Sequence, residues 1–264
     1  MTNDTADAKA GIAAVFDQAA PTYDAVGVDF FGHFGRRLVA IAELSAGERV
    51  LDVGCGRGAS AFPAAEAVGA SGSVLGIDLA PGMVERTAGD AAARGLGWLT
   101  TRVGDAEDPA VPPGSVDVVL AGLILFFLPD LPAALRRYAE ALVPGGRLAV
   151  TSFAGDDPRW KPVFDAVNSF MPEGSGPPRP PGGGEDGPFS STERLHSALE
   201  TAGYVEPVSV VEEHVTRFRD GDHWVEWSRS HGLLALWLAV GDRRAEAEEA
   251  ARAEAGGVAG RRRW

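Results

Sequence analysis

The chain has 264 residues, with 24 Lys and Arg against 37 Asp and Glu, and a formal net charge of −13. This excess of acidic residues argues against a nucleic-acid partner or an anionic membrane surface, because binding to either depends on Lys and Arg. A single cysteine excludes an internal disulfide and a cysteine-based zinc or iron–sulfur site. The first residues do not form a targeting signal, and the most apolar stretch, 116–128, is too short to cross a bilayer. We therefore expect a soluble, cytoplasmic protein that holds no metal.

The first 47 residues have apolar side chains at helical spacing, interrupted at Pro21, Gly27 and Gly32, which predicts two or three short helices. From Arg49 onward, short β-branched runs alternate with helical patterns, which is typical of βαβ units and a parallel sheet. Strands are expected at 49–53, 73–78, 97–103, 116–122 and 147–153, and helices at 57–68, 81–94 and 131–142. The fourth strand is almost continuously apolar, as in a strand buried on both faces.

The C-terminal part begins with an expected helix at 158–171. A Pro- and Gly-rich loop of 17 residues follows at 172–188, and loops of this length are usually lids or disordered inserts. Ser190 or Ser191 is expected to cap the next helix, which would end near Ala202. The remaining elements are expected to be a sixth strand at 204–218, helices at 223–240 and 243–255, and a basic end at 261–263.

The segment RVLDVGCGRGAS, residues 49–60, carries the most specific pattern. Three alternating glycines between a strand and a helix permit a tight turn and let a ligand approach the main chain, while the helix N-terminus offers N–H groups. Asp78 ends the second strand, where a carboxylate can accept both hydroxyls of a ribose. A dinucleotide site would have a further glycine at position 59, which is Ala59 here. The spacing favours a cofactor that has an amino-acid tail and no phosphate, such as S-adenosylmethionine (SAM).

At these residues the chain resembles the class I SAM-dependent methyltransferases. Within them it is similar to the small-molecule branch with the ubiquinone and menaquinone C-methyltransferases and many natural-product enzymes. The resemblance covers roughly residues 16–153 and rests on LDVGCGRG, GIDLAPGMVERT, VGDAEDP and LVPGGRLAV, in the family's order. It implies an α/β fold: a Rossmann-like three-layer sandwich with a mostly parallel sheet, an N-terminal helical cap and a C-terminal helical insertion. The expected parts are a cap at 1–47, a SAM-binding core at 48–155, and a loop, sixth strand and substrate-cap region at 156–264.

The resemblance also implies where SAM would bind. Residues 54–56 would line its methionine part above Asp52, and the carbonyls of residues 121 and 122 would accept from its ammonium group. Asp78 would bind the ribose, residues 79 and 83 would pack on the adenine, and residues 105 and 106 would bind the edge of the adenine. The predicted cofactor-binding residues are Phe16, Tyr23, Asp52, Gly54, Cys55, Gly56, Gly58, Asp78, Leu79, Met83, Gly104, Asp105, Ala106, Ala121 and Gly122.

Several of these residues also have a structural interpretation. Asp52 could cap the following helix or turn, and Asp78 could form a turn at the end of a strand. Asp105 belongs to an acidic loop that could be solvated. Cys55 is better interpreted as a packing residue than as a nucleophile. Segment 16–25 resembles the family's N-terminal segment that folds over the cofactor.

Methyl transfer needs a general base only where the acceptor loses a proton. His33, His231 and Tyr23 are the candidates, and a structural role is the alternative for each. The segment LFFLPD stands where the family often has a polar residue, which suggests an apolar wall on the acceptor side. The predicted substrate-pocket residues are Phe30, Phe126, Phe127, Trp160 and Trp227.

We therefore expect a methyltransferase, a monomer or homodimer, that transfers a methyl group to an O, N or C atom of a small, largely apolar metabolite in secondary-metabolite or quinone-like biosynthesis. The alternatives are a SAM-binding enzyme that does not methylate, such as a cyclase, an NAD-type oxidoreductase and a non-catalytic binding module. The family normally ends its sheet with two strands. The sequence offers one after residue 203, so the seventh strand is expected to be absent, abbreviated, or formed by residues interpreted as helix.

Overall fold

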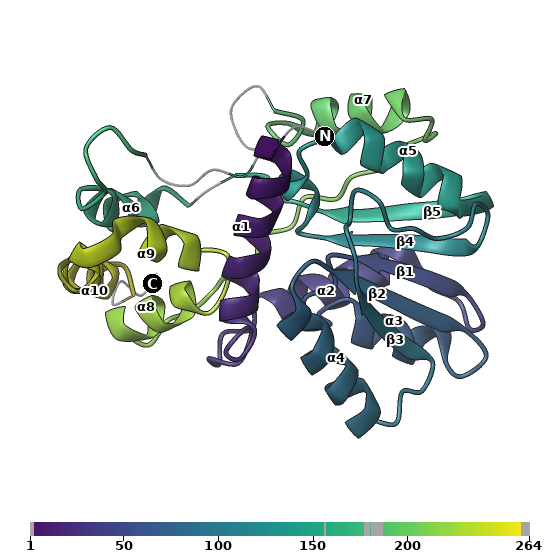
Figure 1. Cartoon of the computed structure of the whole chain (residues 1–264), viewed down its shortest axis with the longest axis horizontal. Coiled ribbons are helices and arrows are strands. Elements are labelled where there is room, and N and C mark those ends of the chain that lie inside the picture. The colour runs from purple at the N-terminus through teal and green to yellow at the C-terminus, as the bar shows by residue number, and fades with distance from the viewer. Residues whose placement is uncertain (1–2, 156, 177–179, 181–186, 260–264) are drawn as a thin grey trace. The chain divides into compact units, whose positions relative to one another are not determined.

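The computed structural model describes residues 3–155, 157–176, 180 and 187–259, and these fall into two compact units (Figure 1). One, the sheet unit, consists of Met1–Asp17, Phe31–Ala154 and Pro180–Glu212. The other, the helical unit, consists of Gln18–Phe30, Gly155–Arg179 and Glu213–Trp264.

The sheet unit is built on a five-stranded sheet in the order β3-β2-β1-β4-β5, in which every neighbouring pair is parallel. The strands are β1 (Arg49–Val53), β2 (Ser73–Asp78), β3 (Leu99–Val103), β4 (Val116–Gly122) and β5 (Leu142–Thr151). The chain runs outward from β1 through β2 to β3 and then returns to the other side of β1 as β4. In open parallel sheets, ligands bind beyond the carboxyl ends of the strands at such a reversal of strand order.

Helices cover both faces of this sheet (Figure 1). One face packs on α2 (Phe31–Ala42), α3 (Ala61–Val68) and α4 (Pro81–Ala93), and the other on α5 (Leu131–Ala141) and α7 (Thr192–Thr201). This arrangement confirms the predicted Rossmann-like three-layer α/β sandwich. The helix α1 (Asn3–Ala19) precedes it, and a short 3₁₀ turn, η1 (Leu125–Phe127), follows β4.

Local sequence signals explain where the helices begin. The side chain of Asp130 accepts the N–H of Ala133 at the start of α5, and that of Ser191 accepts the N–H of Arg194 at the start of α7. Ser191, rather than Ser190, is therefore the cap. The helix expected from residue 57 begins only at 61, because the glycine-rich turn continues through residue 60. Gly32 lies inside α2, so the described residues 3–47 form two helices.

The helical unit contains η2 (Pro158–Trp160), α6 (Lys161–Asn168), α8 (Gly221–Arg229), α9 (Leu234–Val240), η3 (Gly241–Arg243) and α10 (Arg244–Ala259). The helix expected at 223–240 is thus two helices. Gly221 allows α8 to lie against α10, since a Cβ there would be 2.2 Å from the carbonyl oxygen of Arg252. The buried indole N–H of Trp237 donates to the hydroxyl of Ser228 at 3.0 Å, which satisfies a polar group in this core.

The predicted sixth strand at 204–218 is wrong: the structure has no strand between these residues. Its β-branched residues favour an extended backbone, but Glu206 has a left-handed φ of 51° and Pro207 lacks an N–H for a ladder. Val205 and Val208 are 84% and 86% exposed, so no neighbouring strand or helix covers them. Residues 244–259 are helical, and the basic end at 261–263 lies outside the described residues.

None of the helices described here is long and apolar enough to cross a membrane. Among the described residues there is also no group of three or more His, Cys, Asp or Glu side chains placed to hold a metal ion. Most of the Pro- and Gly-rich loop predicted as a lid or disordered insert, residues 177–179 and 181–186, lies outside the described part of the chain.

Candidate active site

The turn after β1 combines three glycines with left-handed backbones, at φ values of 66° for Gly54, 48° for Gly56 and 80° for Gly58. A Cβ on Gly54 would lie 2.5 Å from the side chain of Ile124, and one on Gly58 would lie 2.5 Å from the ring of Phe62. A Cβ on Gly56 would meet nothing within 4 Å. Close packing therefore leaves no room for a side chain at positions 54 and 58, whereas there is open space beside the main chain at Gly56.

Asp78 ties this turn to the end of β2. Its carboxylate accepts the N–H of Gly56 at 2.8 Å and the N–H of Ala80 at 2.9 Å. Burial raises the pKa of Asp78, while these main-chain donors work in the opposite direction. The hydroxyl of Thr87 donates to the carbonyl of Gly56 at 2.8 Å. The structure thus shows Asp78 as a turn-holding residue, and Thr87 is a support that the sequence did not suggest.

Asp52 lies beneath the turn and is fully buried. Both of its carboxylate oxygens are 3.1 Å from the hydroxyl of Ser60. Burial raises the pKa of Asp52 from 3.8 to about 7; the Ser60 hydroxyl opposes this shift and the negative charge of Asp78 adds to it. A Cβ on Gly122 would be 3.3 Å from the Ser60 hydroxyl, so the end of β4 lies beside this pair. Ser60 is the last residue of the segment 49–60, two positions after Gly58, and this place in the motif is the signal that could have identified it.

The side chain of Cys55 packs over Gly76 in the neighbouring strand β2. It is 3% exposed, and a Cβ on Gly76 would lie 2.9 Å from its sulfur. Burial raises the pKa of the Cys55 thiol, and the carboxylates of Asp52 and Asp78 raise it further. A neutral, enclosed thiol agrees with the packing interpretation and not with a nucleophile.

The loop after β3 holds two acidic side chains. Asp105 accepts the N–H of Glu107 at 2.9 Å, and the ammonium of Lys9 pairs with both carboxylates, at 2.7 Å from Asp105. The side chains of Lys9 and Glu107 are only 13% and 8% exposed. Glu107 is therefore buried and paired and not solvated, whereas the side chain of Asp105 is ion-paired but still 29% exposed. Lys9 is 96 residues away in sequence from Asp105, so no local pattern could have revealed this contact.

The described part of α1 in the sheet unit contacts the segments that follow three strands (Figure 1). Besides the contact of Lys9 after β3, the carboxylate of Asp17 accepts the N–H of Gly82, after β2, at 2.6 Å. The ring of Phe16 meets that of Phe127, after β4, edge-on at 5.5 Å. The helix therefore lies along the carboxyl edge of the sheet. Leu79 and Met83, predicted to contact an adenine, are half-buried and buried beside this edge.

Phenylalanines gather after β4. The ring of Phe126 lies 4.7 Å from Phe127, 5.6 Å from Phe153 and 6.1 Å from Phe189, centroid to centroid. We call these residues the phenylalanine wall. Phe153 is 47% exposed. Phe126 and Phe127 were predicted from the sequence, whereas Phe153 and Phe189 join them only through the fold.

Other predicted residues belong to the helical unit, where Trp227 is surrounded by rings. The ring of Phe30 lies 5.6 Å from it, that of Phe218 5.2 Å and that of His231 4.2 Å. Trp160 stacks on the buried Trp224 at 5.7 Å. Nδ1 of His231 is 2.7 Å from the carbonyl oxygen of Trp227.

The hydrogen bond of His231 defines its tautomer. Because a carbonyl can only accept, Nδ1 carries the hydrogen and Nε2 the lone pair. Burial lowers the pKa of His231 to about 4, against a smaller opposing effect of the Trp227 carbonyl. His231 is therefore a neutral imidazole at neutral pH.

The predicted site residues thus divide between the two units. The sheet unit holds Phe16, His33, Asp52, Gly54, Cys55, Gly56, Gly58, Asp78, Leu79, Met83, Gly104, Asp105, Ala106, Ala121, Gly122, Phe126 and Phe127. The helical unit holds Tyr23, Phe30, Trp160, Trp227 and His231. The ring of His33, on α2, meets that of Phe34 at 5.2 Å, and Tyr23 donates its main-chain N–H to the carbonyl of Ala19.

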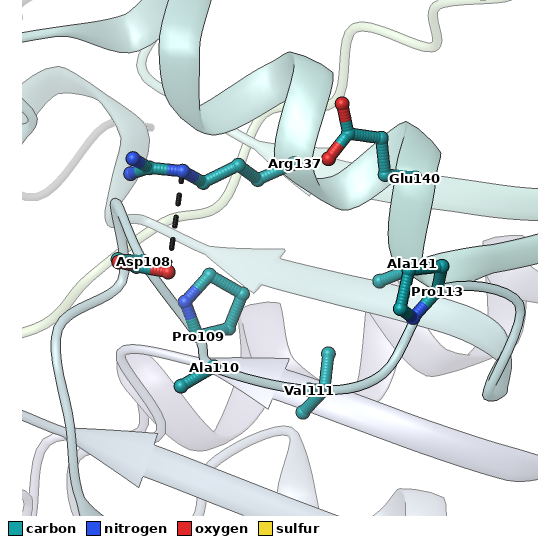
Figure 2. A pocket seen from close by; sticks show the side chains of 8 residues that line it. All are labelled: Asp108, Pro109, Ala110, Val111, Pro113, Arg137, Glu140 and Ala141. Carbon is teal, nitrogen blue, oxygen red and sulfur yellow. Dashed lines mark ion pairs between the residues drawn. The ribbon is translucent and has the colours of Figure 1, made fainter.

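A separate pocket of about 130 Å³ lies between the β3–β4 connection and α5 (Figure 2). Arg137 and Asp108 face each other across it at 4.0 Å, and both side chains are exposed. None of the predicted site residues lines this pocket, so it is not part of the candidate site.

Comparisons with known proteins agree with this geometry. Residues 50–146 match the model of a methyltransferase domain. The chain is 42% identical over 243 residues to nocamycin O-methyltransferase of Saccharothrix syringae, covering 88% of this chain and 86% of that protein. It is 51% identical over 173 residues to aklanonic acid methyltransferase DauC of Streptomyces sp. (strain C5), covering 62% of this chain and 79% of that protein.

A solved structure shares the fold over most of the chain. The [4+2]-cyclase SpnF aligns with a TM-score of 0.53 and 22% identity, over 85% of this chain and 74% of that chain. At this identity the likeness concerns the fold alone. The sequence matches, the glycine-rich turn after β1 and the three-layer fold together show that the chain belongs to the SAM-dependent methyltransferases.

Proposed function

We propose that this enzyme transfers the methyl group of SAM to an oxygen atom of a small, largely apolar natural-product acceptor. The binding of SAM is supported chiefly by the open space beside Gly56. At the other two glycines of the turn, Gly54 and Gly58, neighbouring side chains occupy the corresponding space. The choice of oxygen is supported by the similarity to nocamycin O-methyltransferase. The choice of a natural-product acceptor is supported by the similarity to this enzyme and to aklanonic acid methyltransferase, each matched over more than three quarters of its length.

The residues of the sheet unit fit SAM. The open main chain at Gly56 suits the methionine part, which has no phosphate to hold. Asp52 and Ser60 would lie near the ammonium group of SAM, beside the end of β4. Asp78 would accept hydrogen bonds from the ribose, and Asp105 would accept one from the adenine. The raised pKa of Asp52 indicates that a cation would bind best once this carboxyl is ionised.

SAM, when bound, supplies a methyl group on a positively charged sulfur that leaves as a neutral thioether. The main task of the protein is then to position the acceptor oxygen in line with that methyl group and to exclude water. Two residues of the phenylalanine wall, Phe126 and Phe127, follow β4, the strand whose end would bind the methionine part, and the rings of the wall offer an apolar, flat surface. This surface supports an acceptor with a flat, apolar framework.

We propose His231 as the general base for acceptors that must lose a proton. What supports this role is that burial keeps its imidazole neutral at neutral pH, so that it can accept a proton. His33 and Tyr23 are the alternatives. Replacing His231 with Gln is expected to lower kcat by at least tenfold for a phenolic acceptor, whereas His33→Gln is expected to leave kcat within about threefold. The reverse result would assign the base to His33.

The proposed acceptor class is tested by steady-state kinetics with two series of hydroxyl or carboxyl acceptors, one on a flat aromatic framework and one on an aliphatic framework. The aromatic series is expected to be methylated at oxygen with the higher kcat/KM. In the variant Phe153→Ala, we expect a several-fold higher KM for the aromatic acceptor and an unchanged KM for SAM. Leu238→Ala removes an equally exposed apolar side chain from α9 and serves as control. A preference for aliphatic acceptors, or methylation at carbon, would contradict the proposal.

A further inference from the structure

Lys9 makes an unusually enclosed ion pair for a residue so near the start of the chain. Its ammonium lies between the carboxylates of Asp105 and Glu107, and its side chain is only 13% exposed. Although burial lowers the pKa of Lys9, its bonds to Asp105 and Glu107 raise that pKa above the usual value. Lys9 is therefore a fixed cation inside this contact, unlike a solvated surface lysine.

The contact attaches the N-terminal half of α1 to the sheet unit. Phe16 and Asp17 attach the other end of the helix, at Phe127 and Gly82. Between these ends, the side chains of Ile12 and Val15 are only half-buried. Lys9 thus supplies a polar anchor for the N-terminal half of a helix that lies along the carboxyl edge of the sheet.

Lys9 also orients the two carboxylates. One oxygen of Asp105 accepts the N–H of Glu107, and the other is held by Lys9 at 2.7 Å. Glu107 in turn accepts the N–H of Asp130, and its side chain is 8% exposed. Without the ammonium, two carboxylates would lie close together with one of them buried, and the loop would have to rearrange to hydrate them.

We propose that Lys9 is a positioning residue for the nucleoside end of the cofactor site. It holds α1 along the strand ends and keeps Asp105 in the orientation in which it meets the adenine. The role of Asp105 in this statement rests on the proposed function. Since Lys9 acts on binding and does not reach the transferred methyl group, its loss affects the affinity for SAM and for S-adenosylhomocysteine alike and leaves the chemical step unchanged.

The test compares Lys9→Met, which keeps the length of the side chain without its charge, with Lys9→Arg, which keeps the charge. Arg49→Met is the matched control, because Arg49 forms another long-range ion pair of the sheet unit, with Asp117, at the amino end of β1. The measurements are the Kd of S-adenosylhomocysteine by calorimetry, the KM for SAM and kcat, and amide hydrogen exchange of residues 5–17 in the ligand-free protein.

In Lys9→Met we expect the Kd and the KM to rise at least tenfold, kcat at saturating SAM to stay within about twofold, and the amides of residues 5–17 to exchange faster. Lys9→Arg is expected to restore the Kd to within about threefold of the wild type, and Arg49→Met to leave it unchanged. A Kd within twofold of the wild type in Lys9→Met, or a tighter Kd, overturns the proposal.

A failure of the proposed function has a different outcome. In that case the wild type itself fails to bind S-adenosylhomocysteine, whereas the exchange of residues 5–17 still reports whether Lys9 holds α1. Faster exchange together with an unchanged Kd would show that Lys9 anchors the helix without positioning the cofactor, and it would also overturn the proposal.

Discussion

At the scale of single residues, the glycine-rich turn is supported by a carboxyl group that the fold keeps from water. Asp52 is fully buried and bonded to one hydroxyl, that of Ser60. A single neutral donor offsets little of the cost of burying a negative charge, so the protonated form is favoured. The free protein therefore holds this group near its point of ionisation at neutral pH.

The pKa of Asp52 makes a prediction about stability. The pKa of Asp52 is about 7 in the folded chain and 3.8 when exposed, so the folded chain holds this proton more tightly than the unfolded chain. The protonated carboxyl therefore makes its full stabilising contribution below about pH 4, and this contribution is lost as the pH rises to 7. The loss is on the order of 4 kcal/mol. Asp52→Asn should remove this pH dependence, so its stability relative to the wild type should increase between pH 5 and pH 8, as measured by urea unfolding of the ligand-free protein.

Asp117 provides a control of opposite sign for this experiment. Its hydrogen bonds to Arg49 lower its pKa, so its stabilising contribution is present at neutral pH and is lost as the pH falls through its lowered value. Asp117→Asn should therefore lose stability at pH 7 and have little effect at low pH. If Asp52→Asn and the wild type lose stability in parallel from pH 5 to pH 8, Asp52 is not the buried acid described here.

Gly56 allows a second prediction at this scale. Gly56→Ala places a Cβ in the open space of the turn and costs about 1–2 kcal/mol of stability, because φ is left-handed. We expect a larger effect on binding, with the KM for SAM at least tenfold higher, since the methyl group occupies the space proposed for the cofactor. Gly89→Ala, in α4 and also free of neighbours, should stabilise the protein by about 0.5–1 kcal/mol and leave the KM unchanged.

At the scale of elements, the glycine-rich turn depends on how closely α2 approaches it. A Cβ on Gly35 would lie 2.0 Å from the carbonyl oxygen of Ala59, which is a backbone atom and cannot rotate away. Gly35→Ala should therefore move α2 or the turn and destabilise the protein by about 1–3 kcal/mol in chemical unfolding. Gly11→Ala, in α1 with nothing within 4 Å, is the control and should not destabilise. Equal stability of the two variants would contradict this close packing.

The elements also show what the sequence could and could not predict. The strands β1, β2 and β4 followed from their β-branched runs, because they are largely buried between two helical layers and their pattern reflects that burial. The edge strands β3 and β5 are only partly buried, and β5 begins at Leu142, before the start predicted at residue 147. The segment 204–218 has a similar composition but no strand beside it, and Glu206 and Pro207 interrupt it. Composition alone does not supply the neighbour that a strand needs.

The candidate site divides in the same way. Asp52, Gly56 and Asp78 were identified because the turn that they build is contiguous with a strand and a helix. Lys9, Thr87 and Phe153 were not, since each reaches the site only through tertiary packing from an element distant in sequence. A local pattern contains no information about such contacts.

At the scale of the whole molecule, the net charge of −13 favours a small acceptor over a nucleic acid. We expect no methyl transfer to tRNA or duplex DNA at physiological ionic strength, measured with methyl-labelled SAM. The small-molecule acceptor provides the positive control in the same assay. Incorporation of label into either nucleic acid would contradict the proposed acceptor class.

The proposed function requires that the chain transfers a methyl group and does not merely bind SAM. It is tested most directly by mass spectrometry of a reaction of the wild-type enzyme with SAM and a flat, hydroxylated or carboxylated aromatic acceptor. We expect one methylated acceptor for each S-adenosylhomocysteine formed, with the new methyl group on oxygen. An acceptor that is rearranged without gaining a methyl group, or an enzyme that binds SAM and forms no S-adenosylhomocysteine with any acceptor of this class, would contradict it.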